Sequence, residues 1–292
     1  MISLGCQYLT EMKLLAWDTS TTSGAVVAAE WDATAKDPRA TFRIVAEWHL
    51  SLETAVHSER LLWAIHQVLK ACAWDLASVD VFGVGVGPGS FTGLRIGVTT
   101  ARQLAHTLGK PLVPVSSLAL LVRPAARMIA NENVLVCATR PSAKGEVFAI
   151  WGRPAGLLEC VVRADGDRAG IWSKGVECRA TEPSVVLGAI AARLKRERGL
   201  KWTWMTDVAD KEAYRHEGFE AQMVTELAEK RRVPLPPGSQ FGVQGRELGL
   251  MVWEAVQQQA AREALAVRPS YDRDSEAEVK LRKGELKRAA VE

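Results

Sequence analysis

What the sequence lacks already excludes several classes of protein. No stretch of its 292 residues approaches the roughly 18 apolar residues that a membrane-spanning helix needs, so no membrane partner is expected. Cysteines are few, odd in number and without a CxxC pair: Cys6, Cys72, Cys137, Cys160 and Cys178. That pattern argues against a disulfide framework or a zinc site, and it favours buried free thiols in a reducing cytoplasm. The five histidines contain no pair spaced by three or four residues, so no metal site is expected.

An excess of charge of one sign is also missing. Lys and Arg total 37 against 34 for Asp and Glu, a net charge of +3, which is too small to indicate a nucleic-acid-binding protein. Two short basic runs occur, over residues 193–201 and 230–232. Runs of this size are usually solvated surface, so nucleic-acid binding by the chain alone is not expected.

The apolar residues repeat in patterns typical of alternating strands and helices. In chain order the expected elements are strands over Lys13–Trp17, Ala25–Trp31 and Phe42–His49, a helix over His57–Cys72, a strand over Val79–Val86, a helix over Leu94–Leu108 and a strand over Leu112–Val115. A fainter second copy follows, with strands over Val134–Ala138, Glu146–Trp151 and Leu158–Arg163, a helix over Pro183–Arg198 and a strand over Trp202–Met205. Two tandem βββαβα subdomains are typical of the actin, Hsp70 and sugar-kinase architecture. We therefore predict an α/β chain with the actin-like ATPase (ASKHA) fold.

The same patterns divide the chain into three parts. Residues 12–115 form a first subdomain, residues 116–235 a second, degenerate one, and residues 240–270 a C-terminal helix with a return segment. Residues 1–11 and 272–292 carry little apolar pattern and are expected to be mobile, with Met12 as the natural start.

A polar turn, Asp18-Thr19-Ser20-Thr21, follows the first expected strand. In actin-like ATPases this hairpin carries an Asp near the hydrated metal and turn atoms near phosphate, which requires a carboxylate, hydroxyls and N–H donors. The four residues are therefore the candidate nucleotide site. Asp, Ser and Thr also favour turns for local reasons, so both interpretations stay open. Ser20 stands where kinases of this fold commonly have glycine, which predicts only weak binding of ATP or ADP with magnesium.

The segment Gly85–Arg95 is rich in glycine but matches neither common phosphate loop. No Gly-Lys-Ser/Thr follows it, as in a Walker A loop, and its glycine spacing is one residue too long for GxGxxG. The helix after it has small residues at Gly97, Ala101 and Ala105 beside apolar ones. Such a helix packs closely either inside its own core or against another subunit, and composition leaves both open.

Four segments together resemble the TsaB (YeaZ) family: DTSTTSGAVV, HSERLLWAIHQVL, VGVGPGSFTGLRIGVTTARQLAHTLGKPLVPVSSLALL and the late RPSYDRDSEAEV. The likeness covers residues 13–121 well and the second half in outline. It implies a partner subunit that binds and activates TsaD, a related protein of the same fold, for N6-threonylcarbamoylation of adenosine 37 in ANN-decoding tRNAs. The ATPase TsaE completes the implied set. The resemblance further implies that tRNA is met only through the complex and that the chain alone forms a homodimer.

The resemblance also implies where the partner binds. In this family the helices that follow His57 and Thr92 form a bundle against TsaD or a second TsaB copy, and any residual nucleotide would lie at or near this interface. The implied interface residues are His57, Ser58, Leu61, Leu62, Ile65, Gly89, Ser90, Phe91, Thr92, Gly93, Leu94, Arg95, Gly97, Val98, Ala101 and Ala105.

No catalytic residue is expected in this chain. TsaD holds a metal with a His-x-x-x-His pair just after the strand matching Leu112–Val115, and here Ser117 and Leu121 stand at those positions. The glycine-rich adenosine turn of the fold is matched by Thr206–Asp210, which has no glycine. The resemblance therefore implies an accessory subunit that is not an enzyme on its own, and the family label "glycoprotease-like" has no metal pair to support it. Two alternatives stay open: an active actin-like small-molecule kinase or ATPase, and a stand-alone homodimeric scaffold.

Overall fold

The structure is a computed structural model. It describes residues 11–51, 57–142, 146–159, 161–165, 168–172, 177–206, 231–235 and 244–270. Residues 57–58, 161–165, 168–172 and 177–181 are described by their backbone only.

The first half of the chain forms a five-stranded sheet in the order β3-β2-β1-β4-β5. Its strands are β1 (Glu11–Asp18), β2 (Ser23–Asp32), β3 (Arg43–Ser51), β4 (Val81–Gly85) and β5 (Leu112–Val115). The first three pair antiparallel, and β1, β4 and β5 pair parallel. Two short helices, α1 (Pro38–Thr41) and η1 (Leu76–Ser78), lie in the connections.

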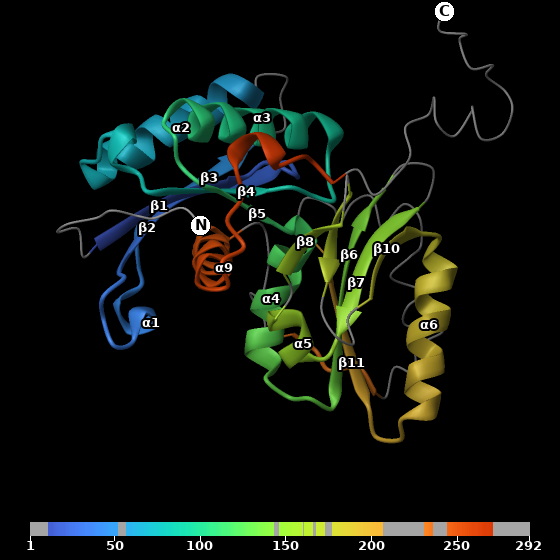
Figure 1. The fold of residues 1–292 in the computed structure, drawn as a ribbon. Helices are drawn as coiled ribbons and strands as arrows, with labels where there is room; N and C mark the ends of the chain where they lie inside the picture. The colour runs from blue at the N-terminus through green and yellow to red at the C-terminus, as the bar shows by residue number, and fades with distance from the viewer. Residues whose placement is uncertain are drawn as a thin grey trace, which may run out of the picture.

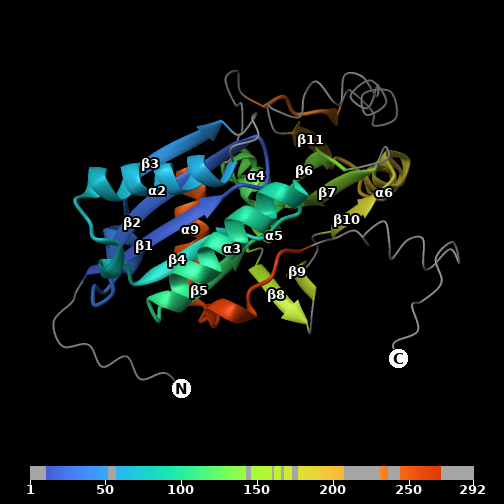
Figure 2. The same ribbon diagram turned by 90° about the horizontal axis from the view of Figure 1, so that it is seen from above.

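Helices cover both faces of this sheet, which explains why β1 is apolar from Leu14 to Trp17. Leu15 and Trp17 point toward α2 (His57–Cys72) and α3 (Phe91–Thr107), whereas Leu14 and Ala16 point toward α9 (Gly245–Gln257) on the other face. Figures 1 and 2 show α2 and α3 side by side over one face and α9 beneath it.

A second sheet has the order β10-β7-β6-β11. Its strands are β6 (Val134–Pro141), β7 (Val147–Gly152), β10 (Glu177–Thr181) and β11 (Lys201–Thr206). One face packs on α6 (Pro183–Arg196), and the other on α4 (Ser117–Ile129). The pairing repeats that of β3, β2, β1 and β4 in the first sheet, with two antiparallel pairs and one parallel pair. The predicted actin-like architecture of two tandem subdomains is therefore confirmed.

One predicted strand of the second copy is wrong. The third strand of this sheet is β10, not Leu158–Arg163. That segment holds the end of α5 (Pro154–Leu158) and the start of β8 (Val161–Asp165), which pairs with β9 (Arg168–Trp172) in a separate two-stranded ribbon. The apolar pattern of the segment fits a strand, but the choice of partner depends on contacts far along the chain.

Most predicted boundaries shift by one to three residues, and two of these shifts have a clear structural reason. Helix α3 begins at Phe91 rather than Leu94, because the Ser90 side chain caps it by accepting a hydrogen bond from the Gly93 N–H (3.3 Å). Glu11 belongs to β1, where it pairs with Asp32, so it is not part of a mobile extension. Residues 1–10 and 272–292 lie outside the described residues, and the division at residues 12–115, 116–235 and 240–270 stays a proposal.

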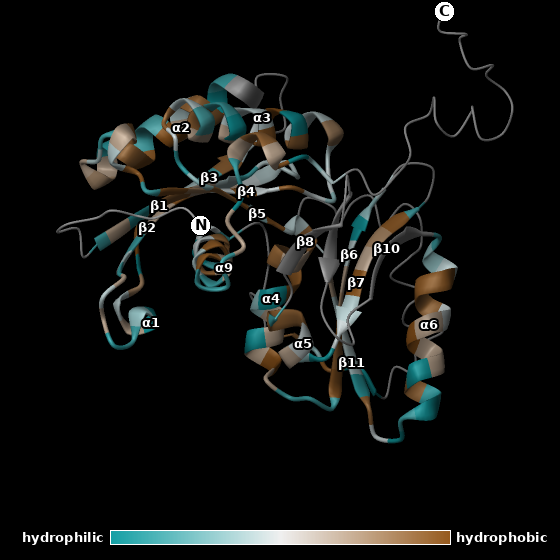
Figure 3. Ribbon diagram, in the orientation of Figure 1, coloured by the Kyte–Doolittle hydropathy of each residue, from teal (hydrophilic) through white to brown (hydrophobic). Residues whose placement is uncertain are grey.

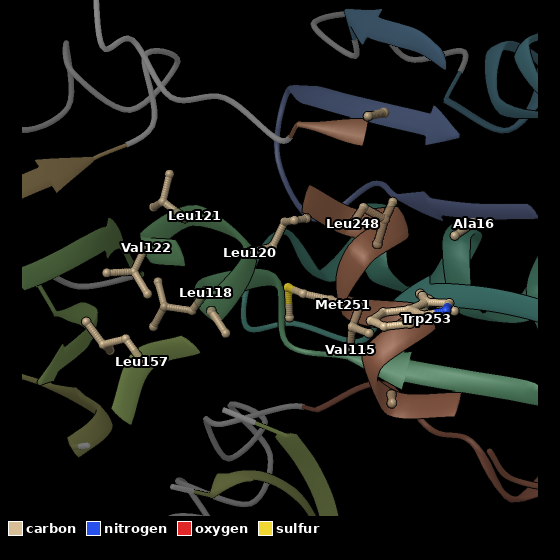
Figure 4. Close-up of a cluster of buried hydrophobic side chains, with 14 of the residues drawn as sticks. Ala16, Val115, Leu118, Leu120, Leu121, Val122, Leu157, Leu248, Met251 and Trp253 are labelled. Carbon is tan, nitrogen blue, oxygen red and sulfur yellow. The ribbon is translucent and has the colours of Figure 1, made fainter. Parts of the chain in front are cut away.

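One hydrophobic cluster joins the two halves. Figure 4 shows Leu118, Leu120 and Leu121 of α4 near Leu248 and Met251 of α9, and all five side chains are buried in the same core. After α9, the chain returns along β5: Leu112 and Arg262 exchange backbone hydrogen bonds just before η5 (Ala264–Ala266). In the part of the chain that the structure describes, no helix combines the length and apolar character needed to cross a membrane.

Candidate functional site

The candidate nucleotide turn is buried, and its carboxylate is fully used within the chain. Asp18 ends β1 and has no exposed surface. Its Oδ1 accepts hydrogen bonds from the Ser20 N–H (2.8 Å) and the Ser20 hydroxyl (2.6 Å), and its Oδ2 accepts one from the Ser117 hydroxyl (2.5 Å). Thr19 and Thr21 are buried as well. Hydroxyl and amide donors of the chain itself therefore satisfy both carboxylate oxygens.

Ser117 connects this turn to the glycine-rich segment. It is the first residue of α4, which Ser116 caps by accepting a hydrogen bond from the Ala119 N–H (3.0 Å). The Ser117 hydroxyl also accepts from the Gly87 N–H (3.1 Å), and the Ser117 N–H donates to the Gly87 carbonyl (2.9 Å). The position at which the resemblance implies a missing metal ligand therefore holds a structural hydroxyl. Leu121, at the second such position, is buried in the core.

The glycine-rich segment packs on the turn rather than leaving room above it. The Ser90 N–H donates to the Ser20 carbonyl (2.7 Å), and the Thr19 hydroxyl donates to the Gly93 carbonyl (2.7 Å). A Cβ at Gly93 would overlap the Thr19 carbonyl oxygen, so glycine is required there for close approach. The segment is therefore complementary to this chain's own turn.

Arg140 completes the site from the second subdomain, and the sequence analysis missed it. It lies near the end of β6, is 1% exposed, and donates from Nη1 to the Ser20 hydroxyl (2.9 Å) and the Pro88 carbonyl (3.4 Å). Its guanidinium places a permanent positive charge beside the Asp18 turn. The only signal for Arg140 in the sequence is that a single arginine stands near the end of an apolar strand.

The structure separates the implied interface residues into two groups. Eight are buried on the inward sides of α2 and α3: Leu61, Ile65, Gly93, Leu94, Gly97, Val98, Ala101 and Ala105. Five are exposed, namely Leu62, Ser90, Phe91, Thr92 and Arg95, and Gly89 is half-buried. The side chains of His57 and Ser58 lie outside the described residues. The eight buried residues cannot touch a partner directly, which corrects that part of the prediction.

The small-residue face of α3 serves packing within the chain. The Trp17 indole N–H donates to the Gly97 carbonyl (2.9 Å), and a Cβ at Gly97 would overlap the Thr19 hydroxyl. Ala101 and Ala105 are fully buried in the same cluster. Of the two interpretations left open for this helix face, close packing in the chain's own core is the one observed.

Exposed apolar side chains mark the outer side of the same two helices. Leu62, Trp63 and Phe91 are 53%, 51% and 53% exposed. The Trp63 ring packs edge-on against Trp48 of β3 at 4.9 Å between centroids, and the Arg95 guanidinium lies 4.2 Å from the centre of the Phe91 ring. We call Leu62, Trp63, Phe91 and Arg95 the outer helix surface. The sequence analysis did not single out Trp48 or Trp63.

The two cysteines whose side chains are described are free and poorly ionised. Burial raises the pKa of the Cys137 thiol, and burial with the nearby Glu30 charge raises the pKa of Cys72 to about 11. Neither thiol is therefore a ready nucleophile. Among the residues that the structure describes, no three His, Cys, Asp or Glu side chains are grouped to hold a metal ion.

Comparisons with known proteins give matches to two proteins that are named for the same tRNA modification. Residues 52–142 match the family described as "TsaD: tRNA N6-adenosine threonylcarbamoyltransferase". The chain is 36% identical over 84 residues to the tRNA threonylcarbamoyladenosine biosynthesis protein TsaB of Haemophilus influenzae, 33% over 154 residues to that of Bacillus subtilis, and 29% over 215 residues to that of Escherichia coli. These matches cover 29%, 52% and 73% of this chain, and 36%, 60% and 78% of the relatives. The chain thus spans less than two thirds of the length of the first two.

Solved structures share the fold over nearly the whole chain. YeaZ from Pseudomonas aeruginosa superposes with a TM-score of 0.57 at 21% identity, covering 89% of this chain and 99% of that one. A second structure from that organism, described as an uncharacterized protein with similarity to peptidase YEAZ, gives 0.58 at 21% identity, covering 90% of this chain and all of that one. The three relatives compared in sequence are thus TsaB proteins, and the two solved structures share the fold of this chain.

Proposed function

We propose that the chain is a non-catalytic partner subunit that binds and activates a TsaD-type transferase for N6-threonylcarbamoylation of adenosine 37 in ANN-decoding tRNAs. The names of the relatives assign them to threonylcarbamoyladenosine biosynthesis, and the matching family model is that of the transferase. The proposal extends that role to this chain. It places the chain in the cytoplasm, with the ATPase TsaE as a further member of the assembly.

One observation carries the non-catalytic part of the proposal: the site where this fold handles phosphate and metal is occupied by the chain's own groups. Asp18 accepts hydrogen bonds from Ser20 and Ser117 on both oxygens, and the Gly87–Gly93 segment is packed onto Ser20. Arg140 supplies a positive charge from the other subdomain. These contacts support a site that holds the fold together, with at most weak nucleotide binding.

The outer helix surface is the proposed binding site for the transferase. Leu62 and Phe91 expose more than half of their surface, although apolar side chains of this size are usually buried. Exposed aromatic and apolar side chains beside an arginine are typical of the energetic centre of a protein–protein interface. When the transferase is missing, a second copy of the chain is expected to cover the same surface.

Co-purification with the TsaD subunit of the same organism tests the partner role. The variant Leu62→Glu/Phe91→Glu places two carboxylates on the surface and is expected to weaken the pairing by at least about tenfold, or ~1.4 kcal/mol. The matched control is Val185→Glu, which charges a 45% exposed valine on α6, far from α2 and α3. If the double variant paired as tightly as the control, the proposed surface would be wrong.

A single-turnover assay with threonylcarbamoyl-AMP and tRNA tests the absence of catalysis. Product is expected only when the TsaD subunit is present, and more of it when this chain is added. Product formed by this chain alone would contradict the proposal.

A further inference from the structure

The two short basic runs of the sequence meet at one corner of the molecule. Arg231 donates from Nη1 to the Leu194 carbonyl in the last turns of α6 (2.7 Å), and the Val233 N–H donates to the Trp202 carbonyl (2.7 Å). The Arg232 guanidinium lies 5.7 Å from the Trp202 ring centre. Figure 1 places this corner at the lower end of α6, where the chain turns into β11, and Figure 3 shows that end of the helix as hydrophilic.

Several of these cations are not neutralised. Lys195, Arg196, Arg198 and Lys201 are exposed, and none of them forms an ion pair with another residue in the described ranges. We call these four, with Arg231 and Arg232, the basic end.

Two acidic residues of the described part of the chain lie at this corner, and each already has a partner. Glu197 is held by Arg193 (2.8 Å) and Arg153 (2.5 Å), and the Arg193 hydrogen bond, helped by Arg153, holds the pKa of Glu197 below its usual range. Glu132 accepts a hydrogen bond from the Ala155 N–H (2.9 Å). Lys195, Arg196, Arg198 and Lys201, which form no ion pair in the described ranges, are therefore available to an external anion, in a chain whose overall charge is only +3.

Helix stabilisation explains only part of this cluster. Cations in the last turn of a helix interact favourably with its dipole, which accounts for Lys195 and Arg196. Arg198 and Lys201 lie beyond the helix end, and residues 231–232 come from a distant part of the sequence. Convergence of cations from separate segments onto one surface is the electrostatic pattern of a polyanion site.

We propose that the basic end is a contact surface for RNA phosphates, which holds tRNA while the transferase partner acts on it. The inference rests on the proposed function for the identity of the RNA. The basic end lies at the opposite end of the molecule from α2 and α3 (Figure 1), so a partner on the outer helix surface would leave it accessible. None of the exposed large hydrophobic side chains falls within residues 193–201 or 231–235, whereas membrane-surface binding mixes cations with such side chains.

The test compares two triple variants with the same change in charge. Lys195→Gln/Arg196→Gln/Arg198→Gln removes three cations of the basic end. The control, Lys36→Gln/Arg39→Gln/Arg246→Gln, removes three exposed cations elsewhere. Each protein is combined with its TsaD subunit, and affinity for an ANN-decoding tRNA transcript is measured between 50 and 200 mM salt, a range that resolves phosphate contacts.

The basic-end variant is expected to pair normally with TsaD but to bind the tRNA about tenfold more weakly than the control near 100 mM salt. The association constant for tRNA should also depend less steeply on salt. The slope of its logarithm against log salt should become smaller in magnitude by about 2, because each lost phosphate contact removes roughly 0.7–0.9. Affinity and slope equal to those of the control would overturn the inference. Loss of binding to phosphatidylserine vesicles, with tRNA binding unchanged, would also overturn it and assign the surface to membranes.

Failure of the proposed function is separately visible. If no complex with TsaD forms with the wild-type chain, the partner role is wrong. The tRNA titrations are then repeated with the chain alone. Equal affinity and salt slope for the basic-end variant and the control variant would again overturn the inference.

Discussion

At the scale of single residues, Asp18 shows how a catalytic-looking carboxylate becomes a structural one. The side chain is fully buried, and a buried carboxylate is tolerated only when hydrogen bonds replace its water shell. Ser20 and Ser117 provide those bonds, and Ser117 also accepts from the Gly87 N–H. A single hydroxyl therefore satisfies a carboxylate oxygen and a backbone amide in two different segments.

We predict that Ser117→Ala lowers the free energy of unfolding by about 2–3 kcal/mol, because it leaves a buried carboxylate oxygen and a buried N–H without this partner. Urea denaturation measures the effect. Ser184→Ala is the matched control, since Ser184 is also in the first turn of a helix but is exposed, and its replacement should change stability by less than about 0.5 kcal/mol. Equal effects of the two substitutions would contradict the structural role of Ser117.

At the scale of elements, a buried ion cluster ties α4 to α9. Arg123 donates from Nε to Glu247 (2.6 Å), from Nη2 to Glu254, and from Nη1 to the Leu158 carbonyl at the end of α5 (2.6 Å). Arg127, one turn further along α4, binds Glu247 at 3.0 Å. The Arg123 and Glu247 side chains are 2% and 5% exposed. Three helices from distant parts of the sequence are therefore fixed to one another by a few charges.

Glu247→Gln is predicted to destabilise the fold by about 3 kcal/mol, because it removes one carboxylate of a buried ion cluster and leaves Glu254 alone to compensate Arg123 and Arg127. The double variant Arg123→Met/Glu247→Met should lose less than the sum of its two single variants, a coupling that a double-mutant cycle in urea measures. Arg246→Met, which alters the exposed neighbour of Glu247, serves as the control. Additive losses would show that the pair does not act as a unit.

At the scale of the whole molecule, the two subdomains meet over the Asp18 turn. Arg140 reaches Ser20 from β6, and Ser117 reaches Asp18 from α4. Opening this junction for a nucleotide would break those contacts together with the Ser90–Ser20 backbone hydrogen bond. We therefore expect the contacts between the subdomains to oppose nucleotide binding at this junction.

We predict that 1 mM ATP with magnesium raises the midpoint of thermal unfolding by less than about 1 °C. Binding with a dissociation constant of 10 μM would stabilise the fold by about 2.7 kcal/mol at that concentration, equivalent to several degrees for a chain of this size. Differential scanning fluorimetry, with AMP as a comparison ligand, measures the shift. A shift of several degrees specific to ATP would favour the kinase or ATPase alternative.

The sequence predicted the elements well where the signal is local. The helix over His57–Cys72 and the strand over Leu112–Val115 have the predicted bounds. The third strand of the second sheet was misplaced. The strand that pairs with β7 is β10, and the period of apolar residues along a strand does not encode which other strand it pairs with. For the candidate site, Asp18 and Ser20 were identified from turn chemistry, whereas Arg140 was missed because nothing near it in sequence shows what it faces.

The sequence by itself determined the apolar run of β1, the amphipathic face of α2 and the glycine-rich segment Gly85–Arg95, because each depends on neighbours a few positions apart. Only the tertiary structure decided which face of α3 turns inward, that Ser117 bonds to Asp18 across 99 positions, and that Arg231 joins the basic end of α6. Those outcomes depend on how distant segments pack, since the burial of one surface leaves another exposed. The inward face of α3 packs against the Asp18 turn, and its outward face stays exposed.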